Sequence, residues 1–235
     1  MIKNIFIASL IGSLIGLDRT AIFQTMISQP IVTAPIIGFL LGNYTIGIAI
    51  GVALQLIWLF SLQIGAAIVF NSTLASVIIT SSTIQILNAV NGQNKIFPAI
   101  AAFSFLLCLP FLFIEQKMDM VTRKVNVFWA KRAEELINEG KFSAIGLTNL
   151  SGSIFFFFKN LLFLLISTSI ITAVMTASYP ALPPGFIEGL SLFFKLMPLL
   201  GVAIVLERIL IKKNYIYFFV GFFITIILHF ILESI

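Results

Sequence analysis

The sequence predicts an all-α, polytopic integral membrane protein, with broken or re-entrant helices in its N-terminal half and a surface amphipathic helix in its middle. Of its 235 residues, 60% are hydrophobic and only 10% are charged, and the mean hydropathy is +1.12. Soluble domains carry about 25% charged residues, so this composition indicates a membrane protein. Because a spanning helix needs ~20 residues, the length predicts roughly seven to nine membrane segments. We expect them to form a single membrane domain, residues 1–235.

The first apolar run covers residues 4–17 and ends at Asp18-Arg19. We take this run as part of the mature protein rather than a signal peptide, because the chain continues hydrophobic after it. The two charges are expected at the water interface, since burying one costs ~2.5–3.5 kcal/mol on insertion scales. Adjacent residues on a helix do not face one another, so they need not form a pair.

The next stretch, 24–75, is apolar but is interrupted by helix-breaking residues. These are Pro30, Pro35, Gly38, Gly42, Gly47, Gly51 and Gly65. Within it, segments 31–41 and 46–62 are separated by Gly42-Asn43, and each is shorter than a comfortable span. This pattern predicts tilted, broken or re-entrant helices buried against protein. The glycine spacings favour close helix packing over substrate contact.

Five further spans are predicted after this stretch: 74–90, 96–114, 154–178, 186–206 and 215–232. Between the second and third lies the hydrophilic segment 115–141, in which apolar residues recur at helical spacing until Gly140. We interpret it as an amphipathic helix on the membrane surface. It separates N-terminal helices (1–114) from C-terminal helices (142–235). It also supplies the basic residues expected to dock a cytosolic partner: Arg123, Lys124, Lys131 and Arg132.

Nine of the 14 basic residues lie in two segments, 115–141 and 208–213. Basic loops favour the cytoplasm, and the two spans predicted between these segments allow both to lie there. Topology therefore accounts for the net charge of +5, and we expect no nucleic-acid partner.

Motifs for catalysis are missing from the sequence. There is no phosphate-binding GxxxxGK[ST] and no HExxH, Cys108 is alone, and the one histidine, His229, lies in an apolar run. No pair of membrane-embedded carboxylates stands out as a proton relay. We therefore predict no catalytic residue, no metal and no cofactor, and leave open whether the chain is part of an enzyme.

The polar side chains of 24–75 are mostly amides and hydroxyls, which suit a neutral polar solute. We predict a substrate-binding lining of Gln24, Gln55, Trp58, Gln63, Asn71 and Thr73, with Trp58 as a stacking platform. The alternatives are that Trp58 is an interfacial or packing aromatic and that the amides join helices through hydrogen bonds.

Specific residues in this stretch resemble a known family. Gln29-Pro30, Gly38, Gly42-Asn43, Thr45 and Gly47 form one block, and Gln55–Trp58, Ile64–Ala67, Asn71 and Leu74-Ala75 form a second. The segment AKRAEELINEGKFSAIG, then Leu182-Pro183, Gly189-Leu190 and Met197–Gly201, continue the likeness. Together they resemble the membrane subunit IIC of the mannose/fructose/sorbose family of bacterial sugar phosphotransferase systems.

The resemblance implies a function and a set of partners. A IIC subunit pairs with a second membrane subunit, IID, in the bacterial cytoplasmic (inner) membrane, and together they bind and translocate a hexose or related sugar. A cytosolic IIB component, charged through IIA, phosphorylates the sugar. The resemblance further implies multimers of IIC–IID pairs and a sliding, elevator-like movement of the substrate site.

Three positions depart from the family pattern. Members commonly have an acidic residue in place of Gln55, Pro-Asp in place of Phe70-Asn71, and Gly-Asp in place of Gly42-Asn43. An amide keeps an acceptor and adds two donors, so sugar hydroxyls can still be bound. The alternatives are a subunit for an unusual sugar and a non-transporting membrane scaffold or regulatory relict of the same fold. An ion-driven permease is a third, disfavoured by the lack of a buried carboxylate.

Overall fold

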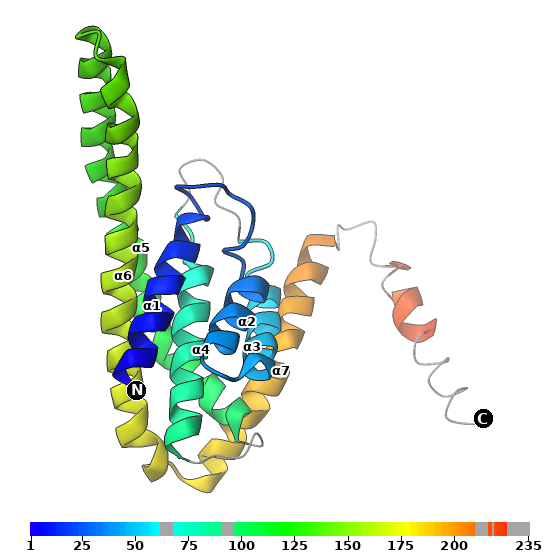
Figure 1. The fold of residues 1–235 in the computed structure, drawn as a ribbon. Helices are drawn as coiled ribbons and strands as arrows, with labels where there is room; N and C mark the ends of the chain where they lie inside the picture. Colours follow the sequence, from blue (N-terminus) through cyan, green and yellow to red (C-terminus); the bar gives the residue numbers. More distant parts are fainter. Residues whose placement is uncertain (62–67, 91–95, 210–215, 218, 225–235) are drawn as a thin grey trace.

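The computed structural model describes residues 1–61, 68–90, 96–209, 216–217 and 219–224. The regular structure within these ranges is helical, which confirms the all-α prediction. The elements are α1 (Ile2–Leu17), α2 (Pro30–Leu40), α3 (Tyr44–Ile57), α4 (Ser72–Ala89), α5 (Phe97–Asn138), η1 (Phe142–Ala144), α6 (Ile145–Ser178), η2 (Tyr179–Ala181) and α7 (Pro184–Ile209). These seven α-helices form a body with α4 at its centre, and α5 and α6 extend beyond it (Figure 1).

The break predicted at Gly42-Asn43 is a tight reversal between α2 and α3. Gly42 has φ +81°, and its N–H donates to the carbonyl of Phe39, while the Asn43 N–H donates to the carbonyl of Gly38 at 2.8 Å. This pair of bonds is the Schellman motif, which favours glycine at the left-handed position. The Asn43 side chain then caps α3 by accepting from the Ile46 N–H.

The glycines of α2 and α3 bring the two helices into backbone contact. A Cβ on Gly47 would lie 2.5 Å from the Ala34 carbonyl oxygen, and one on Gly38 would lie 2.9 Å from the Gly47 Cα. This confirms the close-packing interpretation for Gly38, Gly47 and Gly51. It was wrong for Gly42, which forms the turn and has open space where a Cβ would lie. Both open ends of the pair face the end of the body from which α5 and α6 extend, and the turn stops short of the opposite end (Figure 1). The pair is therefore re-entrant in shape.

α4 forms the core of the body although it is rich in serine and threonine. Its residues from Thr73 to Leu87 are all buried, and it packs against α1, α2, α3, α5 and α6. Its serines direct their hydroxyls to carbonyls of the same helix, as Ser81 does to Val77 and Ser82 to Ile78, both at 2.6 Å. Small, internally bonded side chains allow several helices to approach one buried helix.

The segment 115–141 was expected to lie on the membrane surface, but it projects away from the body instead. Its helical character is confirmed, but it continues α5 without a break through Pro110 to Asn138, where Gly140 begins the turn into η1. A helix of 42 residues is about 63 Å long, about twice the hydrocarbon thickness of a bilayer. The C-terminal part of α5 pairs with the start of α6 to form an arm that projects along the axis of the body (Figure 1).

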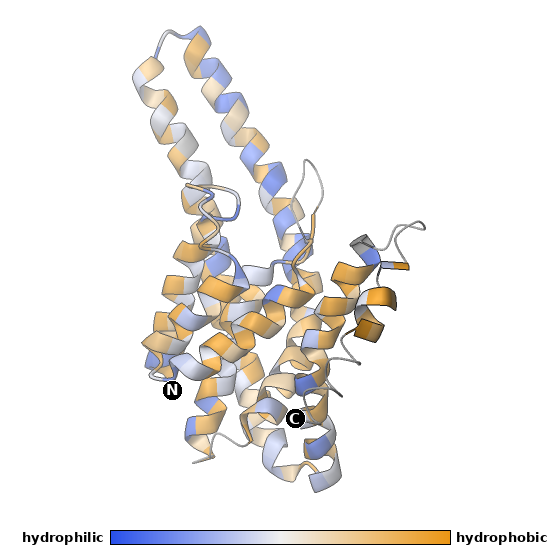
Figure 2. Cartoon of the chain, turned by 90° about the vertical axis from the view of Figure 1, so that its right-hand side faces the viewer, coloured by the Kyte–Doolittle hydropathy of each residue, from blue (hydrophilic) through white to orange (hydrophobic). Residues whose placement is uncertain are grey.

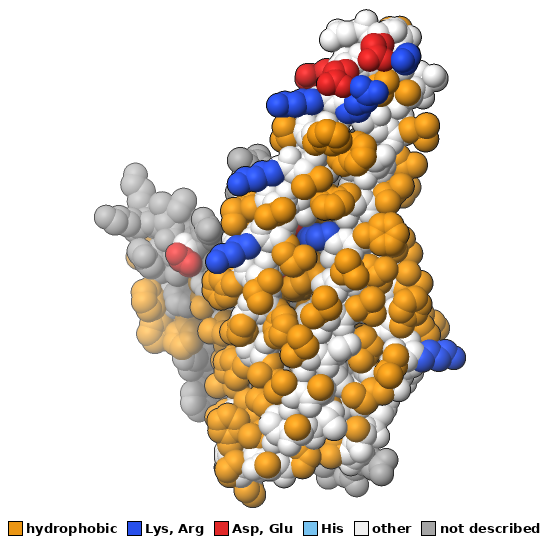
Figure 3. All heavy atoms as spheres, turned by 90° about the vertical axis from the view of Figure 1, so that its left-hand side faces the viewer, with side chains coloured by type: hydrophobic (Ala, Val, Ile, Leu, Met, Phe, Trp, Pro, Cys, Tyr) orange, Lys and Arg blue, Asp and Glu red, His pale blue; other side chains and the backbone are white. Residues whose placement is uncertain are grey.

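Hydropathy follows this division between body and arm. α5, the segment 142–181 that holds α6, and α7 are each long and apolar enough to cross a membrane, while α1, α2 and α3 are shorter apolar helices. Polar residues concentrate on the arm (Figure 2), and hydrophobic side chains cover the body while charged ones gather toward the arm's tip (Figure 3). The last predicted span, 215–232, lies largely outside the described residues.

Candidate functional site

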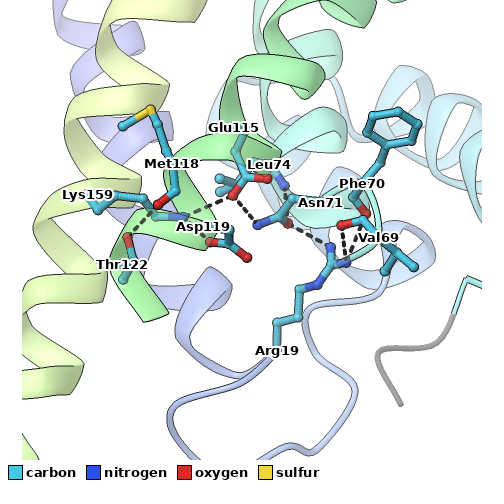
Figure 4. Close-up of polar contacts among 10 residues, drawn as sticks. All are labelled: Arg19, Val69, Phe70, Asn71, Leu74, Glu115, Met118, Asp119, Thr122 and Lys159. Carbon is cyan, nitrogen blue, oxygen red and sulfur yellow. Dashed lines mark hydrogen bonds and ion pairs between the residues drawn. The ribbon is translucent and has the colours of Figure 1, made fainter. Parts of the chain in front are cut away.

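A buried ionic cluster lies where the arm joins the body. Lys159 of α6 contacts Glu115 Oε1 at 2.9 Å and Asp119 Oδ1 at 2.6 Å, and all three side chains are buried (Figure 4). Glu115 and Asp119 are four residues apart on α5, so both face the same side of that helix. Lys159 also lies over the ring of Phe156. One lysine side chain thus faces two carboxyl groups in this cluster.

Asn71 connects this cluster to Arg19. Its Nδ2 donates to Glu115 Oε1 at 3.0 Å, and its Oδ1 accepts from Arg19 Nη1 at 2.9 Å and from the Leu74 N–H, which caps α4 (Figure 4). Arg19 further donates to the carbonyls of Phe70 and Val69. The amide can donate to a carboxylate on one side and accept from a guanidinium on the other, which an ionised carboxylate cannot do. An aspartate at this position would instead face Glu115 with a like charge.

The segment after α1 is fastened to α4 by a second set of hydrogen bonds. Asp18 is buried and accepts from the Thr25 N–H and hydroxyl, both at 2.7 Å, and from the Ser28 N–H at 3.1 Å. The Thr73 hydroxyl donates to the Ser28 carbonyl at 2.6 Å. Asp18 and Arg19 thus have separate partners, as predicted for adjacent residues, but both are held by the loops of this end rather than lying free at an interface.

Gln29 and Gln55 extend the polar contacts to α2 and α3. Gln55 Nε2 donates to Gln29 Oε1 at 3.1 Å, and Gln55 Oε1 accepts from the Ile31 N–H at 3.3 Å. Ile31 lies in the first turn of α2, so Gln55 satisfies one of the N–H groups that a helix start leaves without a partner. Ser28 and Gln29 are consecutive, and therefore the contacts run from α6 through α5, α4 and the 18–29 loop to α3. We call this set, from Lys159 to Gln55, the polar network.

The residues predicted to line a substrate site take different positions. Asn71, Thr73 and Gln55 belong to the polar network. Trp58 follows α3 and packs against Phe105 of α5, with ring centroids 6.3 Å apart. Gln24 is exposed in the 18–29 loop with φ +56°, and its amide donates to the Thr20 carbonyl. Gln63 lies outside the described residues.

Three charged residues of the network, Glu115, Asp119 and Lys159, were not predicted from the sequence. The expectation that the chain lacks a buried carboxylate was wrong, because Glu115 and Asp119 are both buried against Lys159. They were assigned to a polar surface segment that in fact continues α5. Two signals were available: the four-residue spacing of the carboxylates and the single lysine in the apolar run FFFFKN. A charge in such a run indicates a buried partner.

Of the four basic residues expected to dock a partner, three are exposed on the arm and one is half-buried. Lys124, Lys131 and Arg132 are exposed, and Arg132 pairs with Glu135 at 2.7 Å on the same helix. Arg123 is half-buried and faces a cavity at the root of the arm. Among the described residues, no group of three or more His, Cys, Asp or Glu side chains could hold a metal ion, and Cys108 is buried.

We expect the Asp18→Asn variant to lose an acid-sensitive part of the protein's stability. Burial raises the pKa of Asp18, but the hydrogen bonds from Thr25 and Ser28 outweigh it and leave that pKa below its ordinary value. A carboxylate with a lowered pKa stabilises the fold above its unfolded value of about 3.9, and this stabilisation disappears as the pH falls through the lowered pKa. Thermal unfolding of both proteins should be measured at several pH values. The original protein should have the higher melting temperature at neutral pH, and the difference from the variant should become smaller below about pH 4. A difference in melting temperature that does not change with pH would contradict this role for the carboxylate.

Comparisons with known proteins agree with this architecture. The family model described as "PTS system sorbose-specific iic component" matches residues 2–235. Three similar proteins are the sorbose-specific EIIC component of Klebsiella pneumoniae, the mannose-specific EIIC component of Escherichia coli (strain K12) and the fructose permease IIC component of Bacillus subtilis (strain 168). Their identities to this chain are 28%, 26% and 24%; the matches cover 85%, 83% and 83% of this chain and 71%, 69% and 68% of those proteins.

Two solved structures share the fold. One, described as a membrane protein, superposes with a TM-score of 0.69 at 23% identity. The other is a chain of the complex between the mannose transporter ManYZ and microcin E492, with a TM-score of 0.53 at 22% identity. Each match covers 94% of this chain and 84% of the other.

Proposed function

The chain belongs to the sorbose-specific IIC family of the phosphotransferase system, and on this premise we propose that it is the IIC subunit of a hexose transporter in the bacterial cytoplasmic membrane. The family match over residues 2–235 carries the proposal. In the proposed complex the chain pairs with a IID subunit, multimers form from such pairs, and the IIB component, charged through IIA, phosphorylates the sugar. The proposal assigns no step of the phosphoryl transfer to a residue of this chain.

We place the sugar beside the polar network, between the end of α3 and the N-terminus of α4. This end contains Gln55, Asn71 and Thr73, and Trp58 lies one turn beyond Gln55. The buried Asn71 and Thr73 hold the loops in place and so position the site. Gln55 is half-buried, and its remaining N–H and lone pairs can meet sugar hydroxyls. Binding of a sugar by amides rather than carboxylates also distinguishes this site from the family pattern, since hydrogen bonds to ionised groups are roughly twice as strong.

The arm end of the body faces the cytoplasm in this proposal. Basic residues gather on the arm, and α7 returns toward the same end (Figure 1). Lys124, Lys131 and Arg132 are exposed there, and in this proposal they bind the cytosolic IIB component. Residues 210–213, the rest of the second basic segment, lie outside the described residues.

Uptake of labelled hexoses tests the proposal in cells that contain the chain with its IID partner and the soluble components. We expect uptake, and a loss of about 10-fold or more for Gln55→Ala and Asn71→Ala, because the first removes two and the second three hydrogen bonds that position the site. Asn88→Ala is the control, because this amide is exposed at the far end of α4, and it should leave uptake within a factor of about 2. If no hexose is taken up, and both variants behave like the control, a non-transporting scaffold is the better account.

A further inference from the structure

A cavity of about 550 Å³ lies at the root of the arm, outside the polar network. Its walls are α5, α6 and the two residues that follow Arg19 in the loop after α1. Small side chains such as Ala130, Ala133 and Gly152 keep it open, and its polar lining is Thr20, Arg123, Asn126, Trp129, Thr148 and Ser153. This volume lies within the range of small-molecule sites.

Two polar atoms in this lining are buried and have no hydrogen-bond partner among the described residues: the Asn126 Oδ1, an acceptor, and the Trp129 Nε1, a donor. An unsatisfied buried polar group is costly, so such atoms point to a partner that the chain does not supply. Gly152 lies opposite Asn126, and a Cβ there would come within 3.4 Å of the Asn126 Oδ1. The lack of a side chain on Gly152 therefore lets the Asn126 amide lie close to α6.

The charged side chain in the cavity wall is the guanidinium of Arg123. The nearby Arg19 interacts electrostatically with Glu115 and Asp119 as well as with Arg123. None of the described residues in the lining is acidic. Among the carboxylates nearby, Glu115 and Asp119 contact Lys159, and Asp18 accepts from Thr25 and Ser28. An anion in the cavity would therefore meet a guanidinium and none of these carboxylates in the wall.

We propose that this cavity binds a phosphate ester that carries hydroxyl groups. Arg123 faces the phosphate, for which a guanidinium has matching geometry. Asn126 Oδ1 accepts from a hydroxyl, and Trp129 donates its N–H while its ring covers the apolar face of the ligand. Two sources share this chemistry: a hexose phosphate in solution and the headgroup of phosphatidylglycerol at the membrane surface. The first source rests on the proposed function, because a hexose phosphate is the product of the proposed transport reaction.

Binding to the purified full-length chain tests this proposal directly. In a Trp58→Phe background, Trp129 is the one remaining tryptophan, so its fluorescence reports the cavity. We expect a saturable change on adding glucose 6-phosphate, with glucose and inorganic phosphate as weaker competitors, or on replacing phosphatidylcholine nanodiscs by nanodiscs that contain phosphatidylglycerol. The first result identifies a soluble ester and the second a lipid headgroup.

Two neighbouring positions on α5 provide a matched control. Arg123→Gln removes the charge in the cavity wall, whereas Lys124→Gln removes the same charge from an exposed position. We expect the first to weaken binding about 10-fold or more and the second by less than about 2-fold. Asn126→Ala, which keeps every charge, should also weaken binding, and circular dichroism should show each variant folded.

Two results would overturn the proposal: no response to either ester, or equal losses in Arg123→Gln and Lys124→Gln. Because the assay needs neither IID nor phosphorylation, its failure is distinguishable from failure of hexose uptake. If hexose is taken up but no ester binds, the proposed transport function is supported and the cavity is not an ester-binding site.

Discussion

Replacing Lys159 with methionine is expected to destabilise the protein by about 3–5 kcal/mol. The ammonium group lies 2.9 Å from Glu115 and 2.6 Å from Asp119, and both carboxylates are buried. Methionine has a similar length but no charge, so it leaves two buried anions facing each other. The free energy of unfolding, measured in detergent by chemical denaturation of both proteins, gives the effect.

The exposed pair of Arg132 and Glu135 provides the control for this variant. These groups are 2.7 Å apart, but both side chains are solvent-exposed on the arm. Arg132→Met should therefore cost less than about 1 kcal/mol. The triple variant Glu115→Gln, Asp119→Asn, Lys159→Met should recover much of the loss, because no unpaired charge remains. If Lys159→Met costs no more than Arg132→Met, the ionic cluster does not hold the arm to the body.

Introducing a single methyl group at Gly47 is expected to have the second large effect. The new Cβ of Gly47→Ala would lie 2.5 Å from the Ala34 carbonyl oxygen and 3.0 Å from the Pro35 Cα. Both are backbone atoms, so relief requires the whole of α2 to move away from α3. We expect a loss of about 1–3 kcal/mol in the free energy of unfolding, as for other overpacked cores.

Movement of α2 should also disturb the hydrogen bonds of the polar network. The Gln55 side chain holds Gln29 and the Ile31 N–H across the open ends of the pair. Separation of the helices stretches these bonds, so hexose uptake should fall more than the amount of protein in the membrane does. Gly189→Ala is the control, since a Cβ at this position of α7 has open space around it. A Gly47→Ala protein as stable and active as Gly189→Ala would contradict the backbone contact.

The re-entrant pair was predictable because its causes are local. Gly42 and Asn43 supply a left-handed residue and a helix cap in sequence order, and this combination ends one helix and starts the next. The interpretation of the α2 and α3 glycines as packing residues is similarly local, because their spacing puts them on one helix face. The resemblance in the same stretch led to the family that the full-length match shows.

The candidate site was predictable only in part. Asn71 and Thr73 were singled out as polar residues in an apolar stretch, but their partners, Glu115 and Ser28, come from other elements. The assignment of Glu115 to a surface segment rested on its polar neighbours. Whether such a residue is exposed depends on what α6 brings beside it, and a window of sequence does not contain that information.

The sequence by itself determined the membrane class, the break at Gly42-Asn43 and the family, because composition, turn chemistry and ordered motifs are properties of neighbouring residues. The tertiary structure alone decided that α5 runs on into an arm and that Lys159 neutralises part of a buried acidic pair. It also decided that one amide, Asn71, joins Arg19 to that pair. The physical reason is that the stability of a buried charge depends on groups distant in the chain, which only packing brings within hydrogen-bond distance.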